Sequence, residues 1–97
     1  MTEQNKKDCM RIASYYGYDS QSRQLIEEMA ELTQAINKHW RSFLSKYTEI
    51  KLIEEIADVE ICIEQIKYIL QCEEEVNRIA EIKIKRQFER IKNEYGE

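Results

Sequence analysis

Hydrophobic positions recur along this chain at steps of three and four residues, which is the period of an α-helix and not of a strand. Two long apolar stripes carry the pattern. The first stripe comprises Leu25, Met29, Leu32, Ile36, Trp40 and Phe43. The second stripe comprises Leu52, Ile56, Val59, Ile63, Ile66 and Leu70. Each stripe predicts a helix whose apolar side chains enter a core, and Trp40 is expected there with the others.

Turn signals divide the chain into four predicted helices. The first covers residues 4–16 and ends before Gly17, a residue that suits the left-handed position after a helix. Asp19 or Ser20 is a candidate cap for the second helix, which extends to about residue 44. A third helix follows a turn at residues 45–48 and carries the second stripe. After a break at residues 72–74, the last helix runs to about residue 93.

Composition agrees with a helical fold. Proline is absent and there are only two glycines, so the residues that tighten hairpins and break helices are nearly missing. Hydrophobic residues make up 42% of the chain and charged residues 35%, which is typical of amphipathic helices and not of disorder. The sequence therefore predicts an all-α, four-helix bundle-like fold in one domain, residues 1–97.

The expected surroundings follow from hydropathy, cysteines and charge. No apolar run reaches the roughly 18 residues that cross a bilayer, and MTEQNKKDCM lacks the apolar core of a signal peptide, so we expect a cytoplasmic protein without a membrane partner. Three irregularly spaced cysteines predict free thiols. A net charge of −4 argues against a nucleic-acid polymer as partner, although IKIKRQFERIK is locally basic.

Two nearly identical octapeptides, LIEEMAEL at residues 25–32 and LIEEIADV at residues 52–59, begin the two stripes. At about 100° per residue, Glu28 lies about 60° to one side of the first stripe and Glu31 about 120°. Glu55 and Asp58 stand at the same two angles from the second stripe. Two antiparallel helices packed stripe to stripe would therefore bring these four carboxylates together.

Carboxylates that meet at a helix interface repel one another unless a cation lies between them. Their oxygens suit Mg²⁺ or Mn²⁺, whereas structural zinc sites use mainly Cys and His. A di-iron centre needs two Glu-x-x-His motifs, but the single histidine, His39, has Ile36 three residues before it. The alternative is a duplicated packing unit whose acids only face solvent, because Glu is a good helix former.

The order and spacing of the acids carry a family resemblance. The acids concerned are Glu27, Glu28, Glu31, Glu55 and Asp58. Their pattern, EExxE followed by ExxD, resembles the signature of the MazG-like, all-α nucleoside triphosphate pyrophosphohydrolases. The flanking text YGYDSQSRQLIEEMAELTQAINK and a later K-x-x-R look like the short, single-domain members of that family. The resemblance covers residues 15–91.

This resemblance implies a reaction and an assembly. The reaction is hydrolysis of an NTP or dNTP to the monophosphate and pyrophosphate by metal-activated water. The resemblance implies Mg²⁺ ligands at Glu28, Glu31, Glu55 and Asp58. It places the catalytic role on Glu27 and Glu28, with Glu27 holding or deprotonating the attacking water. It also implies a homodimer or homotetramer whose substrate sites are bounded by helices of two subunits.

Basic residues are the candidates for contact with the substrate phosphates. Lys83 and Arg86 stand one helical turn apart, and Lys38 and Arg41 form a second pair of the same kind. The alternative is a solvated face that pairs with neighbouring acids. Where some members of the family carry an Asn two residues before this Lys, the present chain has Glu81.

Base recognition and the catalytic interpretation both have several candidates. Aromatic rings and amides that could contact a base are Tyr15, Tyr16, Tyr18, Trp40, Phe43, Tyr47, Gln21 and Gln24. A non-catalytic role is the alternative to an enzyme: a helical interaction module, or a regulator that binds nucleotide without turnover. Isoleucines outside the stripes favour self-association in either case.

Overall fold

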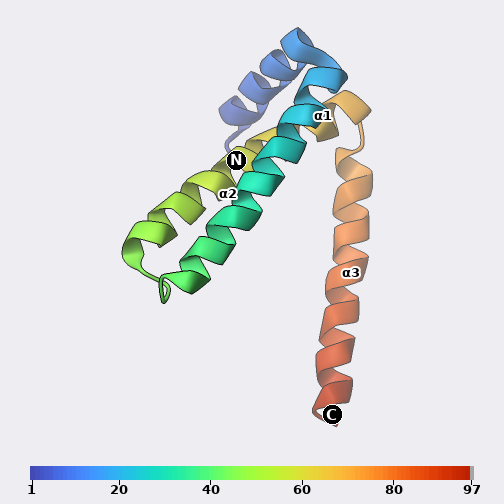
Figure 1. Ribbon diagram of the computed structural model, residues 1–97. Coiled ribbons are helices and arrows are strands. Elements are labelled where there is room, and N and C mark those ends of the chain that lie inside the picture. Colours follow the sequence, from blue (N-terminus) through green and yellow to red (C-terminus); the bar gives the residue numbers. More distant parts are fainter. Residues whose placement is uncertain (97) are drawn as a thin grey trace.

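A computed structural model describes residues 1–96, and these form three α-helices and no strand. Helix α1 spans Glu3–Arg41, α2 spans Lys46–Leu70 and α3 spans Glu73–Glu94 (Figure 1). The prediction of an all-α chain is confirmed within these residues, but there are three helices where four were predicted. Glu97, the last residue of the predicted domain, lies outside the described part.

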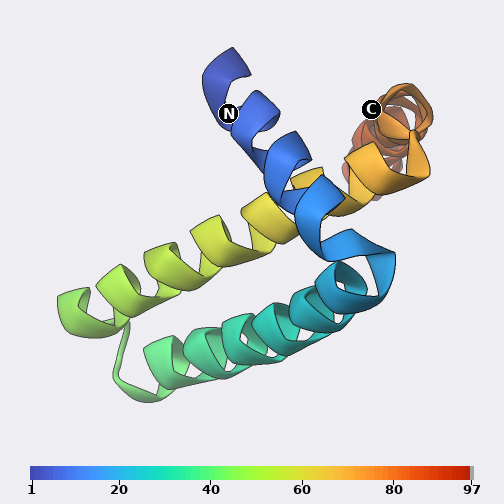
Figure 2. The same ribbon diagram turned by 90° about the horizontal axis from the view of Figure 1, so that it is seen from above.

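The difference in helix number arises at Gly17. This residue has φ 82° and ψ 176° inside α1, a backbone conformation that is essentially restricted to glycine. The first two predicted helices are therefore two arms of α1 joined by a kink: an N-terminal arm, residues 3–16, and a long arm, residues 18–41. The N-terminal arm turns back across α2 (Figure 2), where the Ser14 hydroxyl lies 3.3 Å from that of Tyr68.

A short turn, residues 42–45, reverses the chain between the long arm and α2. Ser45 caps α2 by accepting a hydrogen bond from the backbone N–H of Thr48. The Thr48 hydroxyl also lies 2.7 Å from that of Ser42 and 2.9 Å from Nδ1 of His39. This network stabilises a turn in which two bulky residues, Phe43 and Leu44, have positive φ angles of 57° and 61°.

The long arm and α2 run antiparallel side by side and form a helical hairpin (Figures 1 and 2). Gln21 donates a buried hydrogen bond to Gln65, and His39 pairs with Thr48 near the other end. The two residue numbers in each pair add up to 86 or 87. This constant register places Glu28 opposite Asp58 and Glu31 opposite Glu55.

The core of the hairpin lies between small and polar side chains, and the prediction that the stripes form it is wrong in large part. The buried residues are Cys9, Ala13, Gln21, Ala35, Val59, Cys62 and Gln65. Trp40 is 69% exposed, and Met29, Ile36, Ile56 and Ile63 are exposed as well. The line of contact includes Val59 but is shifted from the centre of the stripes toward the acids, so seven of the twelve stripe residues are exposed.

Helix α3 points away from the hairpin (Figure 1). Gln71, in the left-handed conformation with φ 52°, ends α2 close to the predicted break. No residue of α3 is buried, and its ion pair to the rest of the described chain is Lys6–Glu73, at 3.4 Å. The radius of gyration, 16.7 Å, exceeds the roughly 13 Å of a compact domain of this length. A closed four-helix bundle is therefore not formed by this chain alone.

Among residues 1–96, no helix combines the length and the apolar character that crossing a membrane requires.

Candidate metal centre

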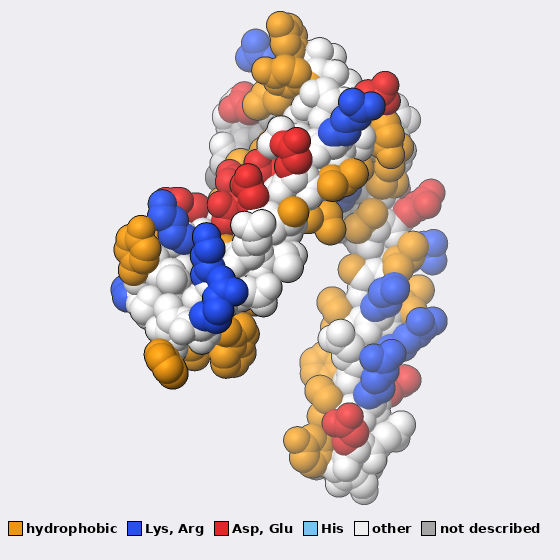
Figure 3. Space-filling view, viewed as in Figure 1, with side chains coloured by type: hydrophobic (Ala, Val, Ile, Leu, Met, Phe, Trp, Pro, Cys, Tyr) orange, Lys and Arg blue, Asp and Glu red, His pale blue; other side chains and the backbone are white. Residues whose placement is uncertain are grey.

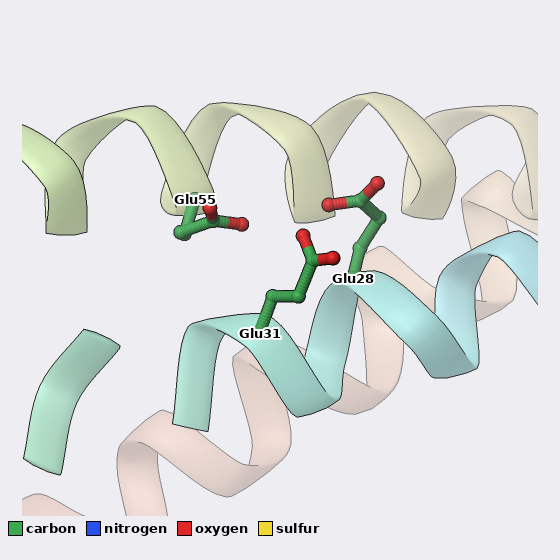
Figure 4. A group of neighbouring side chains, drawn as sticks. All are labelled: Glu28, Glu31 and Glu55. Carbon is green, nitrogen blue, oxygen red and sulfur yellow. The ribbon is translucent and has the colours of Figure 1, made fainter. Parts of the chain in front are cut away.

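Three glutamates meet between the two helices of the hairpin. Glu28 and Glu31 project from α1 and Glu55 from α2, with their carboxylates directed toward one another (Figure 4). One carboxylate oxygen from each residue lies within 4.8 Å of the other two. Oxygens at this separation can share one cation, so the geometry brings together three of the four predicted metal ligands.

The sequence produces this cluster through helix periodicity and register. Glu28 and Glu31 stand about one turn apart, so both face the partner helix from the same side of α1. The antiparallel register then sets Glu55 opposite Glu31. The octapeptides therefore meet as the angles predicted, although the helices touch along the acid side and not along the centre of the apolar stripes.

Two carboxylate oxygens in the cluster are buried and lack a hydrogen-bond donor among residues 1–96: Oε2 of Glu28 and Oε2 of Glu55. The other oxygen of Glu28 accepts a hydrogen bond from Nε2 of Gln24 at 2.7 Å. A buried acceptor without a partner is destabilising, and more so when it is charged. A hard divalent cation would satisfy both oxygens, so this donor set fits Mg²⁺ or Mn²⁺.

The pKa of Glu28 reflects the negative charges around it. The hydrogen bond from Gln24 is the largest single influence and lowers the pKa of Glu28. Burial and the negative charges of Asp58 and Glu31 outweigh it, so that the pKa is raised overall. Burial also raises the pKa of the Cys62 thiol, and the charges of Glu28 and Asp58 add to this effect. Cys62 therefore lies close behind the acids.

The remaining two acids of the signature lie outside this group of three. Asp58 is exposed, and its effect on the pKa of Glu28 places it nearby, but the group of three close oxygens does not include it. Glu27 is exposed and lines a separate hollow of about 480 Å³ with Asp19, Ser20, Arg23 and Gln24.

A cavity of about 460 Å³ opens beside the cluster toward the turn. Its lining consists of Glu31, Gln34, Ala35, Lys38, Tyr47, Thr48, Lys51 and Glu55. Lys38, a predicted phosphate contact, lies in it, whereas Arg41 does not line it. Sequence reasoning missed Lys51, although its position one turn before Glu55 on the same helix face could have revealed it.

The predicted cations of the last helix are not near the acids of the same chain. Lys83 and Arg86 lie on α3, which extends away from the hairpin, and both are exposed. Glu81, at the position where the sequence departs from the family pattern, pairs with Lys85 at 3.8 Å. In the view of Figure 3, Lys and Arg side chains gather at two places, the hairpin tip beside the acids and the length of α3.

Comparison with known protein families, with curated proteins and with solved structures finds no match for this chain. The family resemblance therefore rests on the acid signature and its flanking residues, and it stays a prediction.

Proposed function

We propose that this chain is a Mg²⁺-dependent, or Mn²⁺-dependent, nucleoside triphosphate pyrophosphohydrolase similar to the MazG-like enzymes, acting in the cytoplasm. The observation that carries the proposal is the convergence of Glu28, Glu31 and Glu55 within 4.8 Å, with two buried oxygens that have no donor in the described chain. Solvent-facing acids of a mere packing unit would point apart and stay hydrated.

Each acid has a role in this scheme. Glu28, Glu31 and Glu55 would hold the metal, with Asp58 joining them from the solvent side. When bound, Mg²⁺ supplies positive charge that neutralises phosphate oxygens and lowers the pKa of a water molecule. Glu27, the first acid of the signature, would orient the attacking water and accept its proton. The water adds to the α-phosphorus, and pyrophosphate leaves with the electrons of the broken P–O bond.

Cations beside the acids complete the phosphate site. Lys38 and Lys51 line the cavity that contains Glu31 and Glu55, so their ammonium groups can bind phosphate oxygens of a substrate. Lys51 is 59% exposed and makes only a long ion pair to Glu54, 3.8 Å, so it is free to turn toward a substrate.

A homodimer or homotetramer is part of the proposal. The exposed stripes and the unburied α3 leave more apolar surface in water than single chains usually tolerate. Because α3 extends away from its own hairpin, Lys83 and Arg86 serve a phosphate only if they belong to a neighbouring copy. Light scattering should therefore give at least twice the 11.7 kDa chain mass. A monomer at micromolar concentration would refute the shared site.

The test of the reaction is pyrophosphate release from a panel of ordinary and modified NTPs and dNTPs with Mg²⁺. The parent should release pyrophosphate from one or a few of them, and Glu55→Gln should reduce the rate by at least about 100-fold, the effect typical of removing a catalytic electrostatic contact. Glu60→Gln, at an exposed position of α2 outside the cluster, is the matched control and should retain activity.

A non-catalytic regulator is distinguished in the same experiment. Stabilisation of the parent by millimolar Mg²⁺, without release of pyrophosphate from any nucleotide, would favour a metal- and nucleotide-binding module. A melting temperature that ignores Mg²⁺ would instead favour the interaction module.

A further inference from the structure

The cavity beside the acid cluster has a graded lining. Along α2, Glu55, Lys51 and then Thr48 and Tyr47 follow one another at steps of about one turn. Across from them on α1 lie Glu31, Gln34 and Lys38. Acids therefore occupy one end of the cavity, Gln34 and Lys51 lie toward its middle, and Lys38 and the Tyr47 ring lie at the turn. The eight helical steps from Glu55 to Tyr47 rise about 12 Å, enough to accommodate phosphates, sugar and base in a row.

Only one of the six aromatic candidates from the sequence lines this cavity. Tyr15 and Tyr16 stack edge to face on the N-terminal arm and border a different hollow. Neither Trp40 nor Phe43 is among the residues that surround the cavity. Tyr47 does line it and is 73% exposed, so one face of its ring is available to a ligand.

The amide candidates divide in a similar way. Gln21 is buried and bonded to Gln65, and Gln24 donates to Glu28, so both are engaged in the hairpin itself. Gln34 projects from the cavity wall and makes no side-chain hydrogen bond within residues 1–96. Its amide offers a donor and an acceptor side by side, which is what the edge of a nucleobase requires.

We infer that Tyr47 and Gln34 form the base-binding subsite of this cavity, with the Tyr47 ring stacked on the nucleobase and the Gln34 amide bonded to the base edge. The inference rests on the proposed function, because it takes the acid cluster as the phosphate end of a nucleotide. Lys51, which lies between Glu55 and Tyr47 along α2, then faces the phosphates, and Lys38 lies at the turn end beside Tyr47. The hairpin alone would select the base, and α3 would have no part in that choice.

Steady-state kinetics on the nucleotide panel test this assignment. Base–aromatic stacking contributes about 1–3 kcal/mol, so Tyr47→Ala should raise KM roughly 5- to 150-fold with little change in kcat. Tyr47→Phe keeps the ring and should restore the parent KM. Gln34→Ala should narrow the range of kcat/KM values across bases. Tyr16→Ala removes an exposed ring outside the cavity and is the matched control.

A second measurement needs neither metal nor turnover. Calorimetric titration with the monophosphate of each base, in the presence of a chelator, should give a Kd that Tyr47→Ala raises and Tyr47→Phe does not. Hydrolysis that is intact in the parent and unchanged in base ranking by both the Tyr47→Ala and Gln34→Ala substitutions would overturn the subsite and leave the proposed function standing. Absence of hydrolysis together with Tyr47-dependent binding would overturn the reaction and support the subsite. Absence of both would overturn both.

Discussion

The hairpin of α1 and α2 and the solitary helix α3 are made of similar amphipathic sequence but differ in what they contact. The hairpin packs along a line of small and polar residues, among them Ala35, Val59 and the Gln21–Gln65 pair. Helix α3 leaves its apolar side exposed and buries none of its residues, as the orange atoms along it in Figure 3 illustrate. An amphipathic pattern therefore predicts a helix in both regions, but does not say which face finds its partner in the same chain.

The hairpin and the remaining apolar surface differ in whether they need a second molecule. The acids and the adjoining cavity are assembled by the hairpin alone, because the register and periodicity of two helices are sufficient. The stripes and α3 have no such partner within residues 1–96, so their apolar surface is available for another molecule. Substitutions that affect the two regions differently test this division.

The largest expected effect comes from placing a charge in each region. Val59 is 8% exposed in the hairpin, and Val59→Asp would bury an unpaired carboxylate. We expect the free energy of unfolding to fall by more than about 3 kcal/mol. The matched Ile79→Asp, at a position of α3 that is 43% exposed, should cost the isolated chain less than about 1 kcal/mol and chiefly weaken self-association. Urea denaturation measures both, and equal losses would contradict the division.

An intermediate effect is expected at the two joints of the chain. Gly17→Ala forces an L residue into φ 82°, ψ 176°, which should cost about 1–3 kcal/mol although a Cβ meets no atom within 4 Å. Gln71→Gly, at the left-handed residue before α3, should not destabilise, because glycine adopts φ 52° freely. Thermal denaturation of both variants checks the contrast. A neutral Gly17→Ala would mean that the kink is not required.

The smallest effect is a gain in stability. Without metal at neutral pH, Glu28→Gln removes a charge from the crowded cluster and keeps an acceptor for Gln24, so the variant should be slightly more stable than the parent. Because the pKa of Glu28 is raised in the folded chain, the folded state binds a proton more readily than the unfolded state. The parent therefore gains stability relative to the variant as the pH falls from 7 through the ordinary value of 4.5.

Denaturation of the parent and of Glu28→Gln, in a chelator and at several pH values, tests whether their difference in stability changes with pH in this direction. An advantage of Glu28→Gln that grew at lower pH would contradict it. With millimolar Mg²⁺ the order should reverse, since the parent would be stabilised by the cation and the variant would lose that response.

The sequence predicted the helical class, a break at Gly17 and the meeting of three of the four acids, because each depends on local periodicity or on the special backbone of glycine. The angles of Glu28 and Glu31 from the first stripe were enough to predict that they face the acid side of the second helix, where Glu55 lies. The positions of Trp40 and Ile36 on the first stripe were not enough to predict that they are exposed. An apolar side chain on a helix can pack in the core of its own chain or at an interface between chains.

Two features of the site depend on how the helices are placed relative to one another, which the pattern of a single helix does not reveal. Gln34 lies opposite the α2 wall of the cavity only because of the register between the two helices, so it does not stand out when α1 is considered alone. Lys83 and Arg86 resemble phosphate ligands by spacing, yet the short connection at residues 71–72 directs α3 away from the acids. Long-range placement of this kind is decided by turn geometry.

The four-residue turn at 42–45 therefore restricts how this chain can change over evolution. Its hydroxyl network sets the register, and one inserted residue would rotate α2 by about 100° and shift it by about 1.5 Å relative to α1. Both octapeptides would survive unchanged, but Glu55 would no longer face Glu31. Descendants of this sequence should tolerate exchange of the exposed side chains at the turn far more readily than any insertion or deletion there.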